Sequence, residues 1–291
     1  MYRFLLTRQW VVLTLVAILL IPVMIKLGFW QYHRHEARVA RNELVAGNLG
    51  AAPVPVRELS GPGRDIPRAD TWRRVSGTGT YDAAHEVVVR QRTDEDGQQG
   101  YFVVTPLRLA DGSGTVLVNR GWIPAGNDLT TFPDVPKAPA GELTVTGYLR
   151  ADETTSASGI RDRQGLPDRQ VMLINSEQQA ADGLTGDVLG GYIQLTATAP
   201  KPGGKQPQPV AEPDHSSIGV HLAYAIQWWI FAAAVPFGWW VLVRRERRDR
   251  AERAAAPAPE ETDAPEQTDA ADTADAADTT AAAAAQHAAA D

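Results

Sequence analysis

The sequence predicts a membrane protein in which two transmembrane α-helices flank a β-rich (α+β) extracytoplasmic domain. Three observations lead to this fold class. Two apolar runs, residues 10–29 and 218–243, are each long enough to cross a bilayer. Five arginines follow the second run within seven residues. Between the runs, short segments rich in valine, threonine and aromatic residues alternate with turn residues, which is typical of strands.

The first apolar run reads WVVLTLVAILLIPVMIKLGF and is predicted to be transmembrane helix 1, residues 10–29. Its one charge, Lys26, lies near the far end, where a long side chain can reach the interface. A cleaved signal peptide is the competing interpretation. No small-x-small cleavage site follows the run, so we expect an uncleaved anchor.

The second run, residues 218–243, carries no full charge and has a tryptophan pair near its C-terminal end, as interfacial belts have. The cluster RRERRDR follows directly and favours the cytoplasmic side. Two spans return the chain to its starting side, so residues 1–9 and 244–291 are expected inside and residues 30–217 outside. With no transit peptide before the first span, we expect a multi-pass protein of the bacterial cell membrane.

The segment between the spans, residues 30–217, is expected to begin with a short helix over residues 31–48 and then to change to strands. A hairpin turn is indicated at residues 110–115 and a Pro/Gly/Lys/Gln linker at residues 200–213. We expect an antiparallel sheet. The predicted strand segments are residues 71–82, 85–92, 101–110, 114–124, 142–150, 171–177 and 191–198.

Composition excludes several classes of function. The net charge is −7, but nine acidic residues lie in the stretch 254–291, so the remainder carries about +2. That stretch is too poor in large apolar groups to fold and is expected to be a disordered acidic tail. The absence of cysteine excludes disulfides and thiolate metal sites. No nucleophile, paired-acid or phosphate-loop signature is present and no basic stripe for nucleic acid, so neither an enzyme nor a nucleic-acid partner is expected.

His221 is the candidate that physics alone identifies. It lies three residues into the second span, roughly 5 Å inside its start, where an ionisable side chain has few favourable partners. Ala225, Trp228 and Ala232 share its helical face. Tyr224 lies beside them. The small residues admit a flat ligand or another helix, and the imidazole is either a ligand or an interfacial side chain bonded to a carbonyl or headgroup.

Two further groups are candidates for the same or a neighbouring site. Trp30, Gln31 and Arg34 leave the outer end of the first span at a height similar to that of His221. In VNRGWIP, Arg120 follows a strand and could clamp a carboxylate such as a propionate with its planar fork. The alternative for Arg120 is a buried structural arginine.

Three motifs stand in order between the two spans: LGFWQYHR at residues 27–34, VTPLRL with VLVNRGWIP within 104–124, and HLAYAIQWWIFA at 221–232. Together they resemble the Surf1 family of cytochrome c oxidase assembly proteins, over residues 10–243. The family pattern LGxWQxxR is met at the first motif, NRGW at the second, and His, Tyr-Ala and Trp at the third. Many members carry Asn before that His, where this chain has Val220.

The resemblance implies an assembly factor for haem-copper oxidase that binds haem a transiently and assists its delivery to subunit I. In bacterial relatives the His matched by His221 is the expected axial ligand of the haem iron. The implied partners are subunit I, the haem a synthesis machinery and the lipid bilayer. The implied haem site comprises His221, Tyr224, Trp228, Trp30, Gln31, Arg34 and Arg120. The alternative is a scaffold that binds no haem and stabilises oxidase assembly intermediates.

Overall fold

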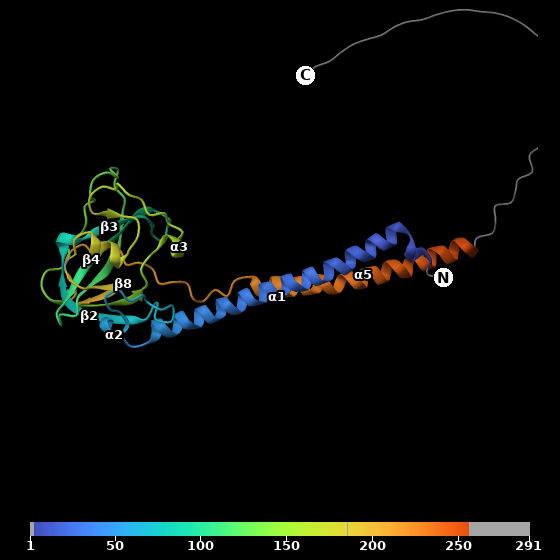
Figure 1. The fold of residues 1–291 in the computed structure, drawn as a ribbon, viewed down its shortest axis with the longest axis horizontal. Helices are drawn as coiled ribbons and strands as arrows, with labels where there is room; N and C mark the ends of the chain where they lie inside the picture. The colour runs from blue at the N-terminus through green and yellow to red at the C-terminus, as the bar shows by residue number, and fades with distance from the viewer. Residues whose placement is uncertain (1–2, 185, 256–291) are drawn as a thin grey trace, which may run out of the picture. The chain divides into compact units, whose positions relative to one another are not determined.

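Two long apolar helices and, between them in sequence, a mixed β-sheet domain make up the chain (Figure 1). The computed structural model describes residues 3–184 and 186–255. A short 3₁₀ helix, Arg3–Leu6, precedes helix α1, Arg8–Gly50, and helix α5 covers His221–Ala255. The acidic segment predicted to be disordered lies, from residue 256 on, outside the described residues.

Helix α1 does not end where the apolar run ends. It has 43 residues, so it is about 65 Å long, roughly twice the hydrocarbon thickness of a bilayer. The predicted helix over residues 31–48 is confirmed as its second half. Apolar side chains of the first half are exposed, for example Leu15 at 60% and Leu19 at 67%. Within the described residues α1 and α5 are both long and apolar enough to cross a membrane.

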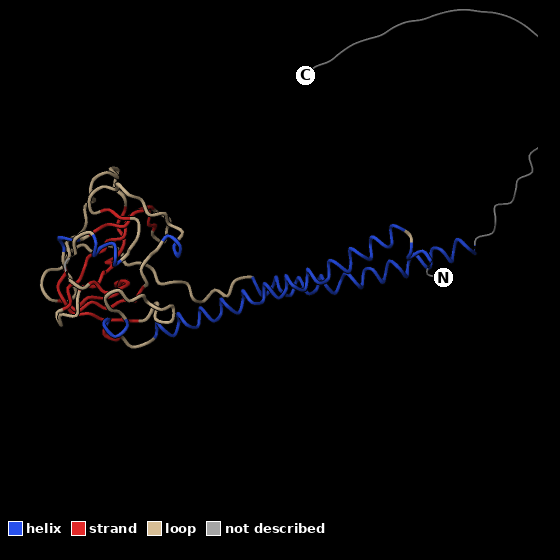
Figure 2. The backbone as a smooth tube through the Cα atoms, in the orientation of Figure 1, coloured by secondary structure: helices blue, strands red, loops and turns tan. Residues whose placement is uncertain are grey.

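The β domain contains eight strands and three short helices. The strands are β1 Val54–Pro55, β2 Arg74–Tyr81, β3 Val87–Thr93, β4 Gln99–Leu109, β5 Thr115–Pro124, β6 Leu143–Arg150, β7 Gln170–Val171 and β8 Val188–Ala199. The helices are α2 Val56–Leu59, α3 Thr155–Ser158 and α4 Ser176–Ala181, and a 3₁₀ turn covers Ala83–His85. Figure 2 shows the long connection from β8 to α5 as loop.

The strands form one sheet in the order β1-β2-β6-β8-β5-β4-β3-β7, and an added pairing of β2 with the end of β4 closes the sheet on itself. The predicted antiparallel arrangement is wrong in part, because β5 pairs with β8 in parallel, as do β1 with β2 and β3 with β7. Parallel pairing of β5 and β8 is possible because the long connection between them carries the chain back to the starting end.

Strand β5 forms the centre of the domain because it is covered on both faces. Val116 and Val118 pack into one apolar cluster with strands β2, β6 and β8. Leu117, between them, packs into a second cluster with β3 and Ile174. Successive side chains of a strand point to opposite faces, so a continuous apolar run such as VLV is what a strand buried on both sides requires.

One predicted strand is wrong. Only Gln170 and Val171 pair as β7, and the next three residues of VMLINSE are buried without strand pairing. Asn175 then caps α4, because its side-chain oxygen accepts from the backbone N–H of Gln178 at 3.0 Å. An apolar run alone cannot distinguish a strand from an irregular core segment. The predicted hairpin at residues 110–115 is confirmed between β4 and β5.

Candidate functional site

The first contact that builds the site joins α1 to α5 at Gly28. This glycine is buried, and a Cβ added there would lie 2.5 Å from Cδ1 of the Trp229 indole. Trp229 also meets Phe29 and Tyr32, with ring centroids 5.6 and 6.1 Å apart. A residue without a side chain is therefore needed at position 28 for the indole to lie against α1.

His221, the first residue of α5, pairs with Gln31 of α1. Its Nδ1 lies 2.9 Å from Oε1 of Gln31. Because an amide oxygen only accepts, this contact places a proton on Nδ1, and in the neutral imidazole Nε2 then carries the lone pair. Within the part of the chain that the structure describes, Nε2 makes no hydrogen bond. The two predicted site residues are thus brought together, and one imidazole nitrogen is left available.

Of the other predicted residues of this group, Trp30 precedes Gln31 on α1 and Tyr224 lies one turn after His221 on α5, and both have exposed rings. Trp30 is 51% exposed and Tyr224 is 46% exposed. The Arg34 guanidinium lies 5.2 Å from the Trp30 ring centroid, a cation–π arrangement. Trp228 packs edge-on against Phe231, with centroids 6.1 Å apart. Trp228 is half-buried, so the aromatic surfaces open to a flat apolar molecule are those of Trp30 and Tyr224.

The small residues on the His221 face are not open. Ala225 is completely buried and Ala232 is 7% exposed. The sequence allowed a flat ligand or another helix against this stripe, and because the protein itself already covers these alanines, they offer no open surface to a flat ligand. The accessible surface near His221 is therefore aromatic and not alanine-lined.

Sequence reasoning missed two α1 residues that hold the start of α5. Arg38 donates from Nε to the carbonyl oxygen of Ser217 at 2.9 Å, and Asn42 donates to the same oxygen at 3.1 Å. Both lie beyond the LGFWQYHR motif, in the half of α1 that looked like a polar helix of no particular role. The signal that could have found them is spacing, since Gln31, Arg34 and Arg38 recur at three and four residues along one face.

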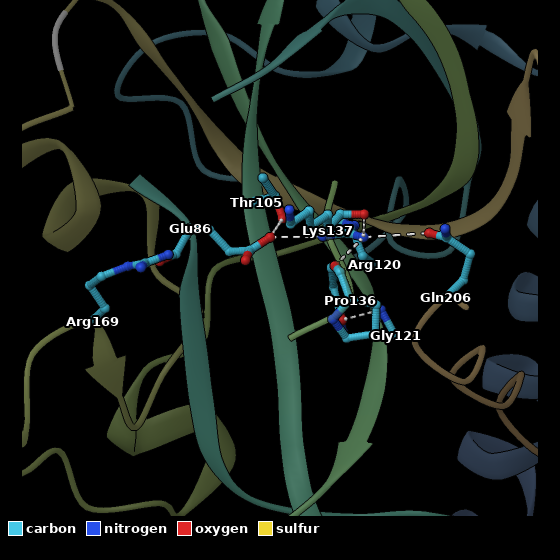
Figure 3. A network of polar contacts seen from close by, with 9 residues as sticks. Glu86, Thr105, Arg120, Gly121, Pro136, Lys137, Arg169 and Gln206 are labelled. Carbon is cyan, nitrogen blue, oxygen red and sulfur yellow. Dashed lines mark hydrogen bonds and ion pairs between the residues drawn. The ribbon is translucent and has the colours of Figure 1, made fainter. Parts of the chain in front are cut away.

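Arg120 belongs to a different place, inside the β domain. Its side chain is 1% exposed and its Nη1 lies 2.8 Å from Oε2 of Glu86, which also accepts from Thr105 at 2.7 Å. Nη2 donates to the carbonyl oxygens of Pro136 and Lys137 at 2.9 and 3.1 Å. Figure 3 shows these partners converging on the guanidinium. This is the arrangement expected for the structural interpretation of Arg120.

The surroundings of Arg120 are buried. Burial raises the pKa of the neighbouring Tyr81 phenol well above its ordinary value, and the charge of Arg120 opposes that rise. The polar partners that the described residues give Arg120 all belong to the β domain. No described hydrogen bond or ion pair joins it to His221 or Gln31.

The NRGW corner also binds the segment 206–212, here called the strap. Trp122 and Gln208 exchange both backbone hydrogen bonds, at 2.7 and 2.8 Å. Gly121 has φ +136°, and any side chain there would meet the Gln208 carbonyl. The predicted linker, residues 200–213, is therefore attached to the sheet through Gln208, near the middle of the linker.

The far end of the strap is attached as well. Gln194 donates to the carbonyl oxygen of Ala211 at 3.2 Å, and the Tyr148 hydroxyl donates to Glu212 at 2.5 Å. Burial, followed by the bond to this carboxylate, raises the pKa of Tyr148 to about 12. The strap thus leaves the sheet only nine residues before His221, so the β domain limits where α5 can begin.

A single imidazole is the metal-binding group that this site offers. The described residues contain no group of three or more His, Asp or Glu side chains arranged for a metal ion. One neutral imidazole nitrogen beside exposed aromatic rings does fit a haem, whose iron already has four ring ligands and needs an axial one.

Comparison with known proteins gives a consistent result. The model of the SURF1 family matches residues 18–233. An uncharacterized SURF1-like protein of Mycobacterium tuberculosis is 34% identical over 267 residues, covering 89% of this chain and 92% of that protein. Surfeit locus protein 1 of Homo sapiens is 25% identical over 249 residues, covering 79% and 76%. That of Takifugu rubripes is 24% identical over 245 residues, covering 76% and 93%.

The buried pair gives a prediction about stability. Replacing Arg120 by Met should lower the free energy of unfolding by about 3–5 kcal/mol, because Glu86 is left buried and unpaired. Adding Glu86→Leu should restore most of the loss. Denaturant unfolding of the full chain in detergent, followed by near-UV circular dichroism, measures both.

Arg57→Met is the matched control, since Arg57 pairs with Asp111 on the surface at 3.1 Å and its removal should change stability by about 0–1 kcal/mol. A stability for Arg120→Met as close to wild type as that of the control would contradict the structural role.

Proposed function

The chain belongs to the SURF1 family, which is associated with cytochrome oxidase assembly, and on this premise we propose that it is an assembly factor for haem-copper oxidase that binds haem a and assists its delivery to subunit I. The observation that carries the proposal is the pairing of His221 with Gln31, which leaves Nε2 with its lone pair beside exposed aromatic rings. Its partners would be subunit I and the haem a synthesis machinery.

The pairing supports a ligand role because it fixes the imidazole. A metal-binding histidine commonly donates its other ring N–H to an oxygen, which sets the tautomer and the ring orientation. Gln31 supplies that oxygen from the neighbouring helix. When bound, haem a supplies an iron that accepts one imidazole nitrogen and a farnesylated ring that is apolar enough to pass through the outer leaflet.

The surroundings support transfer more than storage. Trp30 and Tyr224 are about half exposed, so a bound ring would keep one side open to a partner protein. A carrier must release its cargo, and one axial imidazole on an open site binds less tightly than a closed pocket with two. We propose a carrier and not an enzyme. Arg120 has a structural role in this proposal, because Glu86 and two carbonyl oxygens already occupy its guanidinium.

The proposed function requires that the two helices lie in a membrane. We propose that α1 and α5 cross the bacterial cell membrane with both termini in the cytoplasm and with the β domain outside. The apolar half of α1 supports insertion, since its side chains are exposed in the protein itself. The arginines that follow residue 243 support the orientation. His221 then lies at the outer boundary, within reach of a ligand dissolved in the outer leaflet.

Topology gives the first prediction. A reporter phosphatase that folds only outside the cytoplasm should be active when fused after Gly203, where the sheet is complete, and inactive when fused after Arg253. Membrane levels of both fusions, measured by immunoblot, are the control. Activity of the second fusion and not of the first would overturn the proposed orientation.

The ligand assignment gives the second prediction. His221→Ala should reduce haem content by more than the roughly 10- to 100-fold that loss of an outer-sphere partner of a metal ligand causes. Its abundance in the membrane should not change, because one interfacial histidine contributes little to insertion. The absorption spectrum of protein purified from cells that make haem a measures the content.

His215→Ala is the matched control, because this histidine lies six residues earlier and bonds only the carbonyl oxygen of Pro213 within the described structure. It should keep the wild-type spectrum. If His221→Ala also keeps it, haem binding through this residue is wrong, and the scaffold that binds no haem becomes the better account.

A further inference from the structure

Two arginines of α1, Arg34 and Arg38, lie near the imidazole of His221, and the proposed function gives their charges no role. Gln31, Arg34 and Arg38 are spaced by three and four residues and so lie along one face of α1. Gln31 fixes the direction of that face, because its side chain meets His221. Arg34 and Arg38 therefore lie on the same face of α1 as Gln31, one and two helical turns closer to the β domain.

Arg38 and His221 border the same small space. A Cβ added to Gly219 would lie 3.5 Å from Nη1 of Arg38 and 3.6 Å from Cδ2 of His221. Gly219 has φ +69°, a conformation that other residues rarely adopt. The absence of a side chain at position 219 leaves this space open between the guanidinium and the imidazole.

The guanidinium of Arg38 is oriented but not neutralised. Its Nε donates to the Ser217 carbonyl oxygen, and among the described residues neither Nη group has a hydrogen-bond acceptor. Among the described residues neither Arg38 nor Arg34 forms an ion pair. The charge of Arg38 acts on Asp214, whose pKa is lowered mainly by hydrogen bonds from Ser216, with Arg38 the smallest contribution. Asp214 is thus occupied by the backbone of its own loop.

We propose that Arg38, assisted by Arg34, is a carboxylate-binding subsite that recognises the propionates of the molecule that His221 binds. The inference rests on the proposed function and deepens it. A guanidinium fork binds a carboxylate through two parallel hydrogen bonds. Propionates project from one edge of the ring, so a ligand held through its iron at His221 would turn that edge toward α1 and leave its apolar edge to the aromatic side chains.

Modified porphyrins test the subsite independently of oxidase assembly. Ferric protoporphyrin IX and its dimethyl ester, whose propionates carry no charge, are titrated into the full chain in detergent and followed by absorption. Wild type should bind the free acid roughly ten-fold more tightly than the ester, the effect of one charge-assisted pair. Arg38→Gln should lose that preference while its affinity for the ester and the absorption bands of axial imidazole binding stay unchanged.

The controls separate the possible failures. Arg41→Gln removes the same charge one turn further from His221 and should keep the preference. Arg38→Lys should keep part of it. If Arg38→Gln weakens both porphyrins equally, Arg38 serves only to hold Ser217, and if it weakens neither, the subsite does not exist. If His221→Ala binds each porphyrin as tightly as wild type does, the proposed function itself fails. That result differs from a failure of the subsite alone.

Discussion

The contact between Gly28 and Trp229 is the constraint on which the candidate site depends. Without a side chain at position 28, the indole lies against α1 and sets the register between the two helices. The same register places His221, two turns earlier on α5, beside Gln31, one turn later on α1. The motifs LGFWQ and HLAYAIQWW are therefore two halves of one helix contact.

The β domain contributes to the site by holding the chain that enters α5. Its closed sheet packs apolar side chains on both faces of β5. The NRGW corner uses Arg120 to neutralise Glu86 inside the domain and uses Gly121 and Trp122 to bind the strap. Arg38 and Asn42 then fix Ser217 from the side of α1. The start of α5 is thereby held from both sides.

The sequence predicted the helices, most strands and the central pair of the site, because each has a local signal. Apolar length identifies α1 and α5, alternation identifies β2 and β6, and the motifs pointed to Gln31 and His221. Pairing partners have no local signal, so the parallel contact of β5 with β8 was missed. The same holds for Glu86, which lies 34 residues before its partner Arg120.

Periodicity did not identify the tryptophan that makes the helix contact. Trp228 shares the face of His221 on a wheel, yet the indole that packs on α1 is that of Trp229. A wheel gives the direction of a side chain but not the position of the neighbouring helix, and a large indole can reach around the helix. Arg38 was missed because its partner, Ser217, lies in the loop before α5, and the sequence does not show which residue of α1 that loop meets.

Cross-linking of introduced cysteines tests the central claim, that α1 and α5 pair in the register that joins residue 31 to residue 221. The natural chain has no cysteine, so there is no background. In native membranes, a short bifunctional thiol reagent should cross-link Gln31→Cys with His221→Cys efficiently. It should not cross-link Gln31→Cys with Ile230→Cys, about 13 Å further along α5. Equal yields for the two pairs, or a higher yield for the second, would contradict the account.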